Sequence, residues 1–269
     1  MGMRLKYLEP EYGQRCYDDF LKHVESFEPR NQSSWFFQAR GLVSVASTAY
    51  AIGRPFSESR TWLLKATEAF KQLFALRGTA FTKTTRYRAG KPLPEELVAE
   101  DGYTSHDSML AVYAALVLRD VPLASGLVEL AGPSPNAQFV SPRSQVCTTS
   151  VQKLSHALNA LVAGDMKLAE QEANRPQIRA GTKTDRLLAA AISALATGGD
   201  VIAARDEILK HHATQAMRDL HPGASTFWVC YPALGVSSLA MHLHGYEPGQ
   251  LETDSVYCPI GLLESVSPS

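Results

Sequence analysis

Apolar residues recur every three or four positions along most of this chain, and this spacing constrains the fold more than any other feature. In the first segment Tyr17, Phe20, Leu21, Val24 and Phe27 fall on one face of a helix. A wider apolar stripe of the same period runs through residues 62–76. Runs that alternate Val, Ile and Thr between hairpin turns are almost absent. We therefore predict an all-α protein.

The same periodicity, together with helix-capping and helix-breaking residues, divides the chain into roughly nine to eleven helices. The expected helical ranges are 10–27, 35–53, 57–78, a short 94–100, 105–119, 122–130, 148–163, 165–174, 184–196, 200–212 and 226–244. We expect them to form stacked antiparallel hairpins in one compact domain, 1–269, with 132–146 as the place where a subdivision would fall.

Two stretches with a Gly-Asp turn, "LNALVAGDMKLAEQEA" at 158–173 and "ISALATGGDVIAARDEI" at 192–208, resemble each other. Shifting "ISALATGGDVIAARDEI" back by 34 residues places Leu195 and Gly198 on Leu161 and Gly164, and beyond the turn the shift is 35 because Gly199 is an extra residue. This period is typical of tetratricopeptide repeats. Other junctions are irregular, and the consensus aromatic residue and closing proline are missing. We interpret the pair as close-packed helical hairpins rather than as true repeats.

Charge, cysteine spacing and apolar segments restrict the classes of function that the chain can have. The formal net charge is −1, so no strong overall field attracts nucleic acid, and any charged partner must meet a local patch. The four cysteines are scattered without metal-ligand spacing, which favours reduced thiols in a cytoplasmic protein, and a disulfide in the periplasm is the alternative. The first residues lack the apolar core of a signal peptide, and no stretch reads as a membrane span.

Local motifs give no catalytic, cofactor or metal site. His242 and His244 stand two positions apart, and such residues point about 200° apart on a helix. The triplet Ser105-His106-Asp107 is better explained by helix capping from Ser105 or Thr104 than by a catalytic triad, because triads assemble in space. Nucleotide-binding, nucleophile-elbow and zinc-protease motifs are absent from the sequence. We therefore expect a protein that is not an enzyme.

The stretch 79–101 is the most informative local feature, because its periodicity fails and its charge is divided. The part from residue 79 to residue 94 is basic with interleaved aromatic residues and carries no acidic residue. The part from residue 95 to residue 101 is acidic. The basic part could contact an acidic partner or nucleic acid, or only keep a loop solvated; direct nucleic-acid binding is not expected. The acidic part could imitate phosphate and block a cationic groove. The candidate partner-binding residues are Arg86, Tyr87, Arg88, Glu95, Glu96, Glu100, Asp101 and Asp107.

The overall layout is similar to that of a known class of proteins. The early helices contain Trp35 and Trp62, the later hairpins are rich in alanine, and the chain closes with a Y-x-P-x-x-L-L pattern at Tyr257, Pro259 and Leu262-Leu263. This layout resembles immunity proteins of bacterial polymorphic toxin systems, and among them the immunity protein 49 family. The resemblance implies a non-enzymatic, cytoplasmic antitoxin that binds and neutralises a cognate toxin, such as one delivered by type VI secretion.

A second function stays open at this point. Stacked helical hairpins of the tetratricopeptide type can form a concave groove that binds an extended peptide. The alternative is therefore a scaffold or adaptor for a peptide or protein partner. An enzyme with a helical active site is the third possibility, but the sequence contains no recognisable set of catalytic residues.

Overall fold

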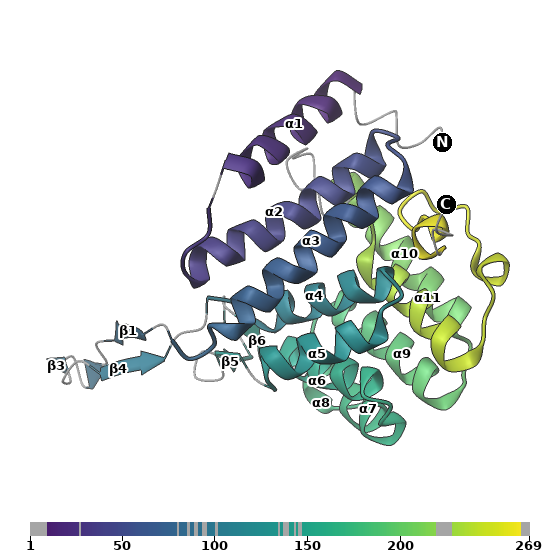
Figure 1. Ribbon diagram of the computed structural model, residues 1–269. Helices are drawn as coiled ribbons and strands as arrows, with labels where there is room; N and C mark the ends of the chain where they lie inside the picture. Colours follow the sequence, from purple (N-terminus) through teal and green to yellow (C-terminus); the bar gives the residue numbers. More distant parts are fainter. Residues whose placement is uncertain are drawn as a thin grey trace.

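The computed structural model describes residues 10–26, 28–79, 81–84, 87–88, 91–92, 96–99, 102–133, 135–136, 140–142, 144, 147–218 and 228–264, and for the four ranges between 81 and 99 it describes the backbone alone. The described part of the chain is a compact all-α body, as predicted, with eleven α-helices (Figure 1). None of these helices combines the length and the apolar character needed to cross a bilayer.

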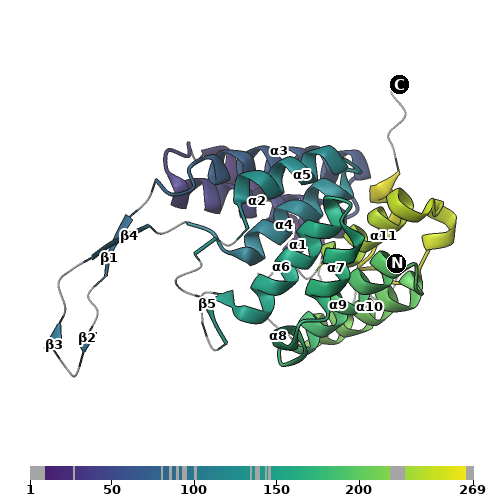
Figure 2. The ribbon, with the colours of Figure 1, turned by 90° about the horizontal axis from the view of Figure 1, so that it is seen from below.

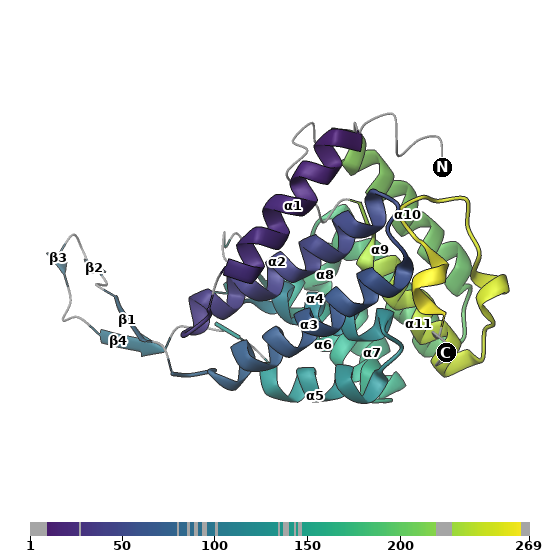
Figure 3. The ribbon, with the colours of Figure 1, turned by 45° about the horizontal axis from the view of Figure 1, so that its top comes forward.

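The first five helices form one layer of the body. They are α1 (Pro10–Ser26), α2 (Gln32–Ala51), α3 (Phe56–Ala75), α4 (Ser105–Val117) and α5 (Val121–Ala131). Helices α2 and α3 make an antiparallel hairpin, and α1 lies along the outer side of α2 (Figure 3). Side chains of Asn31, Thr104 and Asp120 accept backbone N–H bonds at the starts of α2, α4 and α5, which satisfies donors that a helix leaves open.

The remaining helices stack onto this layer. They are α6 (Thr149–Val162), α7 (Met166–Ala173), α8 (Pro176–Arg179), α9 (Lys183–Thr197), α10 (Val201–Arg218) and α11 (Tyr231–His244), followed by two 3-10 turns, η3 (Pro248–Leu251) and η4 (Ile260–Leu263). Three features show the largest differences from the expected ranges. Helix α10 extends to Arg218 rather than ending at residue 212. Helix α8 interrupts a stretch expected to be loop, and α11 begins at Tyr231 rather than at residue 226, with Pro232 in its first turn.

The two Gly-Asp turns have the geometry that the sequence predicts. Gly164 and Gly198 adopt positive φ angles of 80° and 70° at the ends of α6 and α9. Asp165 then accepts a hydrogen bond from the Leu168 N–H, and Asp200 accepts one from the Ala203 N–H, each at 2.9 Å. The helices that follow differ, because α7 has 8 residues and α10 has 18. The shared turn therefore builds two unequal hairpins, as expected for a chain without true repeats.

The stretch 79–101 departs from its expected structure. A loop followed by a short helix at 94–100 was expected, whereas the backbone forms strands β1 (Phe81–Thr84), β2 (Tyr87–Arg88), β3 (Lys91–Pro92) and β4 (Glu96–Ala99). The helix prediction was wrong because β4 pairs antiparallel with β1, and residues so far apart in sequence give no short-range periodic signal. Two further strands, β5 (Val140–Ser141) and β6 (Cys147–Thr148), form a short parallel pair.

Helix α11 lies in the middle of the helical body. Every residue from Ala233 to Met241 is buried, and the helix contacts α4, α9 and α10. Its ends are tied to two other helices: the Tyr231 hydroxyl lies 2.8 Å from Ser47 Oγ on α2, and His244 Nε2 lies 2.8 Å from the Leu195 carbonyl oxygen on α9. A helix that is apolar on all sides is typical of a central position. Helix α11 is therefore buried against α4, α9 and α10.

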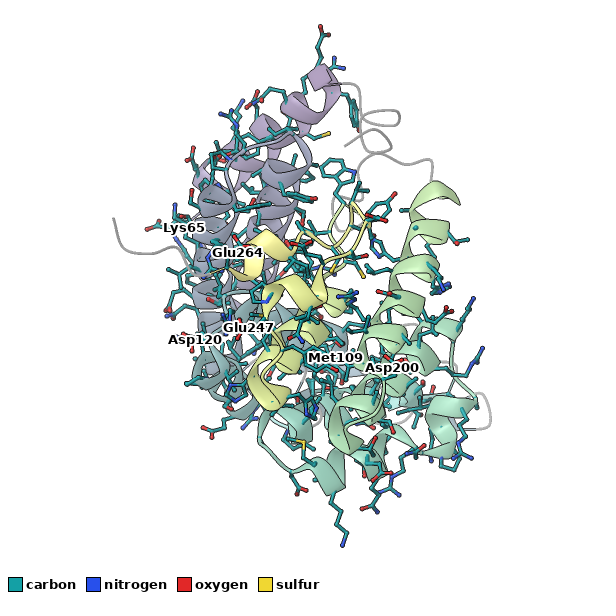
Figure 4. All side chains as sticks on the ribbon, turned by 90° about the vertical axis from the view of Figure 1, so that its right-hand side faces the viewer. Lys65, Met109, Asp120, Asp200, Glu247 and Glu264 are labelled. Carbon is teal, nitrogen blue, oxygen red and sulfur yellow. The ribbon has the colours of Figure 1, made fainter. Side chains whose placement is uncertain are left out.

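Residues 245–264, here called the C-terminal segment, run back over the edge of the body. Figure 4 looks onto this segment, in yellow, between the N-terminal helices and the green helices, with Glu247 and Glu264 labelled on it. Three leucines of this segment, Leu251, Leu262 and Leu263, are buried. The Arg205 guanidinium, 1% exposed, donates to the Leu251 carbonyl oxygen, and Arg60 donates to that of Leu262. These contacts dock the C-terminal segment onto the helical body.

Candidate partner-binding site

A hairpin arm, residues 81–99, projects away from the helical body. Figures 1 and 2 show it leaving the body between α3 and α4 and extending clear of the helices. Strand β1 pairs with β4 at the base, and β2 pairs with β3 toward the tip. Among the described strands each of these four has a single neighbour, so both long edges of the arm carry backbone groups that no described strand pairs.

The arm brings several of the predicted partner-binding residues into register. Tyr87 lies opposite Pro92, Arg88 lies opposite Lys91, and Glu96 lies opposite Thr84. Two basic residues therefore face each other across the outer pair of strands. Four other candidates, Arg86, Glu95, Glu100 and Asp101, lie outside the described residues.

Asp107, the last candidate, is placed in a different setting. It is 4% exposed and lies in the first turn of α4. One carboxylate oxygen accepts hydrogen bonds from the Thr104 N–H and the Thr104 hydroxyl, each at 2.9 Å, and the other lies 3.7 Å from Arg40 Nη1. This geometry is a capping box, in which Thr104 is the N-cap. The Asp107 carboxylate therefore caps α4 at the base of the arm. Because it is buried, it is not available to a partner at the surface of this structure.

Gln32 joins the two ends of the arm to each other. It is 5% exposed at the start of α2, and its amide nitrogen donates to the Leu76 carbonyl oxygen where the chain leaves α3. Its amide oxygen accepts the Gly102 N–H at 2.6 Å, where the chain returns from the arm. One side chain therefore holds the outgoing and the returning backbone together. Sequence reasoning missed Gln32, because a glutamine next to a helix cap carries no sign of this role.

The returning backbone has a second anchor at Tyr103. Its ring, 1% exposed, packs against Phe74 with the ring centroids 4.6 Å apart. Its hydroxyl donates to the Ala131 carbonyl oxygen at 3.0 Å, and its own carbonyl oxygen accepts from Asn136 Nδ2 at 2.8 Å. The residues described on either side of the arm are thus held by α2, α3 and α5.

Three histidines contact other groups of the protein. His244 contacts the Leu195 carbonyl oxygen, His211 Nε2 lies 3.1 Å from Thr184 Oγ1, and the His212 ring packs edge-on against Tyr257. Within the described residues no three side chains of His, Cys, Asp or Glu are placed to hold a metal ion.

A cleft of about 610 Å³ lies between the α2–α3 turn and the C-terminal segment. Tyr50 and Phe56 form one wall, with their rings stacked at a centroid distance of 5.9 Å, and Phe56 is 40% exposed. Carboxylates of Glu252, Asp254 and Glu264 lie along the opposite wall. Burial raises the pKa of the Cys258 thiol, which lines the same cleft, to about 12. A thiol with such a pKa is protonated at neutral pH and is a poor nucleophile.

Comparisons of this chain with protein families, with curated proteins and with solved structures found no match.

Proposed function

We propose that this protein binds another protein through the hairpin arm. The observation that carries the proposal is the arm itself, which extends clear of the body on a base held by Gln32 and Tyr103 (Figure 2). A projecting element on a fixed base loses little conformational freedom on binding, which favours recognition.

The two edges of the arm differ in how well they are protected against pairing. Strand β1 carries Lys83 near its centre, and a lysine on an edge strand discourages pairing with another strand. Strand β4 contains Leu97, Val98 and Ala99 in succession, with no lysine, proline or glycine. The β4 edge is therefore the better template for an added strand from a partner, a common mode of peptide and protein recognition.

The charge of the arm indicates what such a partner would present. The residues next to the β4 edge in sequence, Glu95, Glu96, Glu100 and Asp101, are acidic, whereas the stretch from Arg77 to Pro94 carries only basic charges. We therefore expect the partner strand to be flanked by lysine or arginine. Complementary charges of this kind set the rate and the specificity of association.

The sequence layout supports a more specific form of this proposal. The resemblance to immunity proteins suggests that the partner is a cognate toxin, and that the arm covers a cationic groove of that toxin. The same resemblance suggests that the protein acts in the cytoplasm. A peptide-binding scaffold is less well supported, because α11 packs against α4, α9 and α10 and fills the space that an open helical array would leave for a peptide.

Co-purification with the products of the adjacent genes tests the proposal. The tagged chain is expected to form a 1:1 complex with a toxic neighbour and to restore growth when both are expressed. A variant with Glu95→Gln, Glu96→Gln, Glu100→Gln and Asp101→Asn is expected to bind about 10- to 100-fold more weakly, with a smaller dependence on salt.

The matched control removes four exposed carboxylates from the helical body, with Glu25→Gln, Glu129→Gln, Glu170→Gln and Glu252→Gln. This variant changes the net charge equally and is expected to bind like the unaltered chain. Equal affinity of both variants would reject the acidic side of the arm as the binding surface, and failure to bind any neighbouring gene product would reject the antitoxin function.

A further inference from the structure

Two of the four cysteines lie close together where the C-terminal segment crosses the start of α11. Cys230 directly precedes α11 and Cys258 lies in the C-terminal segment, and they are 1% and 2% exposed. The sequence separates them by a whole helix, so their proximity is visible only in the folded chain.

A backbone hydrogen bond fixes their separation. The Cys230 N–H donates to the Tyr257 carbonyl oxygen at 2.7 Å, and Cys258 follows Tyr257 directly. With planar peptide geometry, this bond places the Cα atoms of Cys230 and Cys258 no more than about 7 Å apart. Disulfide-bonded cysteines have Cα atoms about 4.4–6.8 Å apart, so the backbone already lies near that range.

The surroundings of the two sulfur atoms place them along the same part of α11. Ala233 lies near the sulfur of Cys230, and Ser237 lies near the sulfur of Cys258. Ala233 and Ser237 are one helical turn apart and therefore lie on the same face of α11. Burial raises the pKa of both thiols to about 12, and the neighbouring Cys258 adds to the rise at Cys230.

We propose that Cys230 and Cys258 form a disulfide bond that locks the C-terminal segment onto the first turn of α11. The oxidant is a low-molecular-weight disulfide such as oxidised glutathione. The Cys258 thiolate attacks it, forms a mixed disulfide and releases one small thiol. The Cys230 thiolate then attacks the Cys258 sulfur and releases the second. Two protein thiols are thus oxidised to one disulfide while one small disulfide is reduced to two thiols.

Access to the pair depends on the C-terminal segment. Cys258 lines the cleft beside Tyr50 and Phe56, which gives a small disulfide a path to it. In the docked state, however, both thiols are protonated at neutral pH, and only the thiolate reacts. The exchange therefore proceeds when the segment lifts away from the body and water reaches the two sulfur atoms, and redocking brings them together.

The test uses the complete, unaltered protein, reduced and then equilibrated with oxidised glutathione in mild denaturant. Peptide mapping by mass spectrometry is expected to find Cys230 linked to Cys258, with the intact mass lower by two hydrogens. The melting temperature of the oxidised protein, measured after the denaturant is removed, is expected to rise by about 5 °C or more. A reductant should reverse both changes.

Two variants separate this pair from the other thiols. Cys16→Ser changes a cysteine outside the pair and should keep both the bond and the rise in melting temperature. Cys258→Ala should lose both, and Cys230→Ala serves the same purpose if Cys258→Ala does not fold. Mapping that finds Cys230 and Cys258 both free, each carrying glutathione, or linked to other cysteines would overturn the proposal.

Discussion

Gln32 controls the base of the hairpin arm through two hydrogen bonds, to the Leu76 carbonyl oxygen and from the Gly102 N–H. We predict that Gln32→Ala removes the side-chain partner of the Gly102 N–H and one donor of the Leu76 carbonyl oxygen, which still accepts from Thr79, and so lowers the free energy of unfolding by about 1 kcal/mol. The amide of Gly102 should exchange its hydrogen faster, as measured by hydrogen–deuterium exchange.

Gln72→Ala is the matched control, because Gln72 is an exposed glutamine whose amide bonds only to Glu68 on the same helix. It should leave both the stability and the exchange of Gly102 unchanged. Unaltered exchange at Gly102 in the Gln32 variant would show that Gln32 does not hold the arm.

Glu172 makes the stability of the α6–α7 region depend on pH. Burial opposes its charged form, but the hydrogen bonds from Arg175 and the charge of Lys153, 3.8 Å away, outweigh burial and lower its pKa below the usual value. A lowered pKa in the folded state stabilises the protein above the pKa of the unfolded chain, about 4.3, and this contribution is lost as the pH falls through the folded value.

Denaturant unfolding of Glu172→Gln at several pH values checks this dependence. The variant should be less stable than the unaltered protein at pH 7, and the difference should shrink as the pH falls below about 4.3. A difference that stays constant from pH 7 to pH 3 would contradict the lowered pKa.

At the scale of elements, the approach of α11 to α4 depends on a glycine. A Cβ atom placed on Gly235 would lie 2.4 Å from Tyr113 Cδ1, closer than real atoms come, and Tyr113 is itself buried. We predict that Gly235→Ala forces the two helices apart and lowers the melting temperature, at a cost of about 1–3 kcal/mol.

Gly126→Ala provides the control within another helix, because nothing lies within 4 Å of a Cβ atom placed there. Alanine favours a helix interior by about 1 kcal/mol over glycine, so this variant should be as stable as the unaltered chain or more stable. A Gly235→Ala variant as stable as Gly126→Ala would mean that helix propensity, rather than the contact with Tyr113, decides the outcome.

The C-terminal segment offers a prediction of its own. The Tyr50 hydroxyl donates to the Val256 carbonyl oxygen at 2.8 Å, while its ring stacks on Phe56. Tyr50→Phe removes the hydrogen bond and keeps the ring, so the segment should lift more often and the Cys230–Cys258 disulfide should form several-fold faster without denaturant. The rate of oxidation by glutathione, followed by mass spectrometry, measures this, and an unchanged rate would separate the reaction from the motion of the segment.

The sequence predicts helices and their caps well, because these depend on neighbouring residues. Gly164, Asp165 and Thr104 act within four positions of the groups they bond. The arm was not predicted, because Phe81 pairs with Ala99 and the intervening turns give no helix-like or strand-like period. Gln32 could not be identified either, because its partners Leu76 and Gly102 are distant in sequence and only the fold brings them to it.

At the scale of the whole molecule, we expect the folding stability of the helical body to depend little on the arm. The apolar core extends from Tyr17 to Leu263 through the helices, and the described strands of the arm extend clear of these helices (Figures 1 and 2). Replacing residues 80–101 with a short Gly-Ser linker should therefore leave the helical circular dichroism unchanged and shift the melting temperature by only a few degrees.

The same replacement should abolish binding to the partner of the proposed function. A replacement variant that is unfolded would show that the body needs the arm for its stability. A folded variant that still binds with full affinity would move the binding surface to the helices.

The central position of α11 has a consequence for how the protein is made. The helices that contact it, α4, α9 and α10, all precede it in sequence, so during translation they emerge from the ribosome before the helix that packs between them. Until residues 231–263 follow, the nascent chain exposes the apolar faces that α11 later covers. Ribosome-bound chains that stop before residue 231 should therefore bind chaperones, and release from them should coincide with the synthesis of α11.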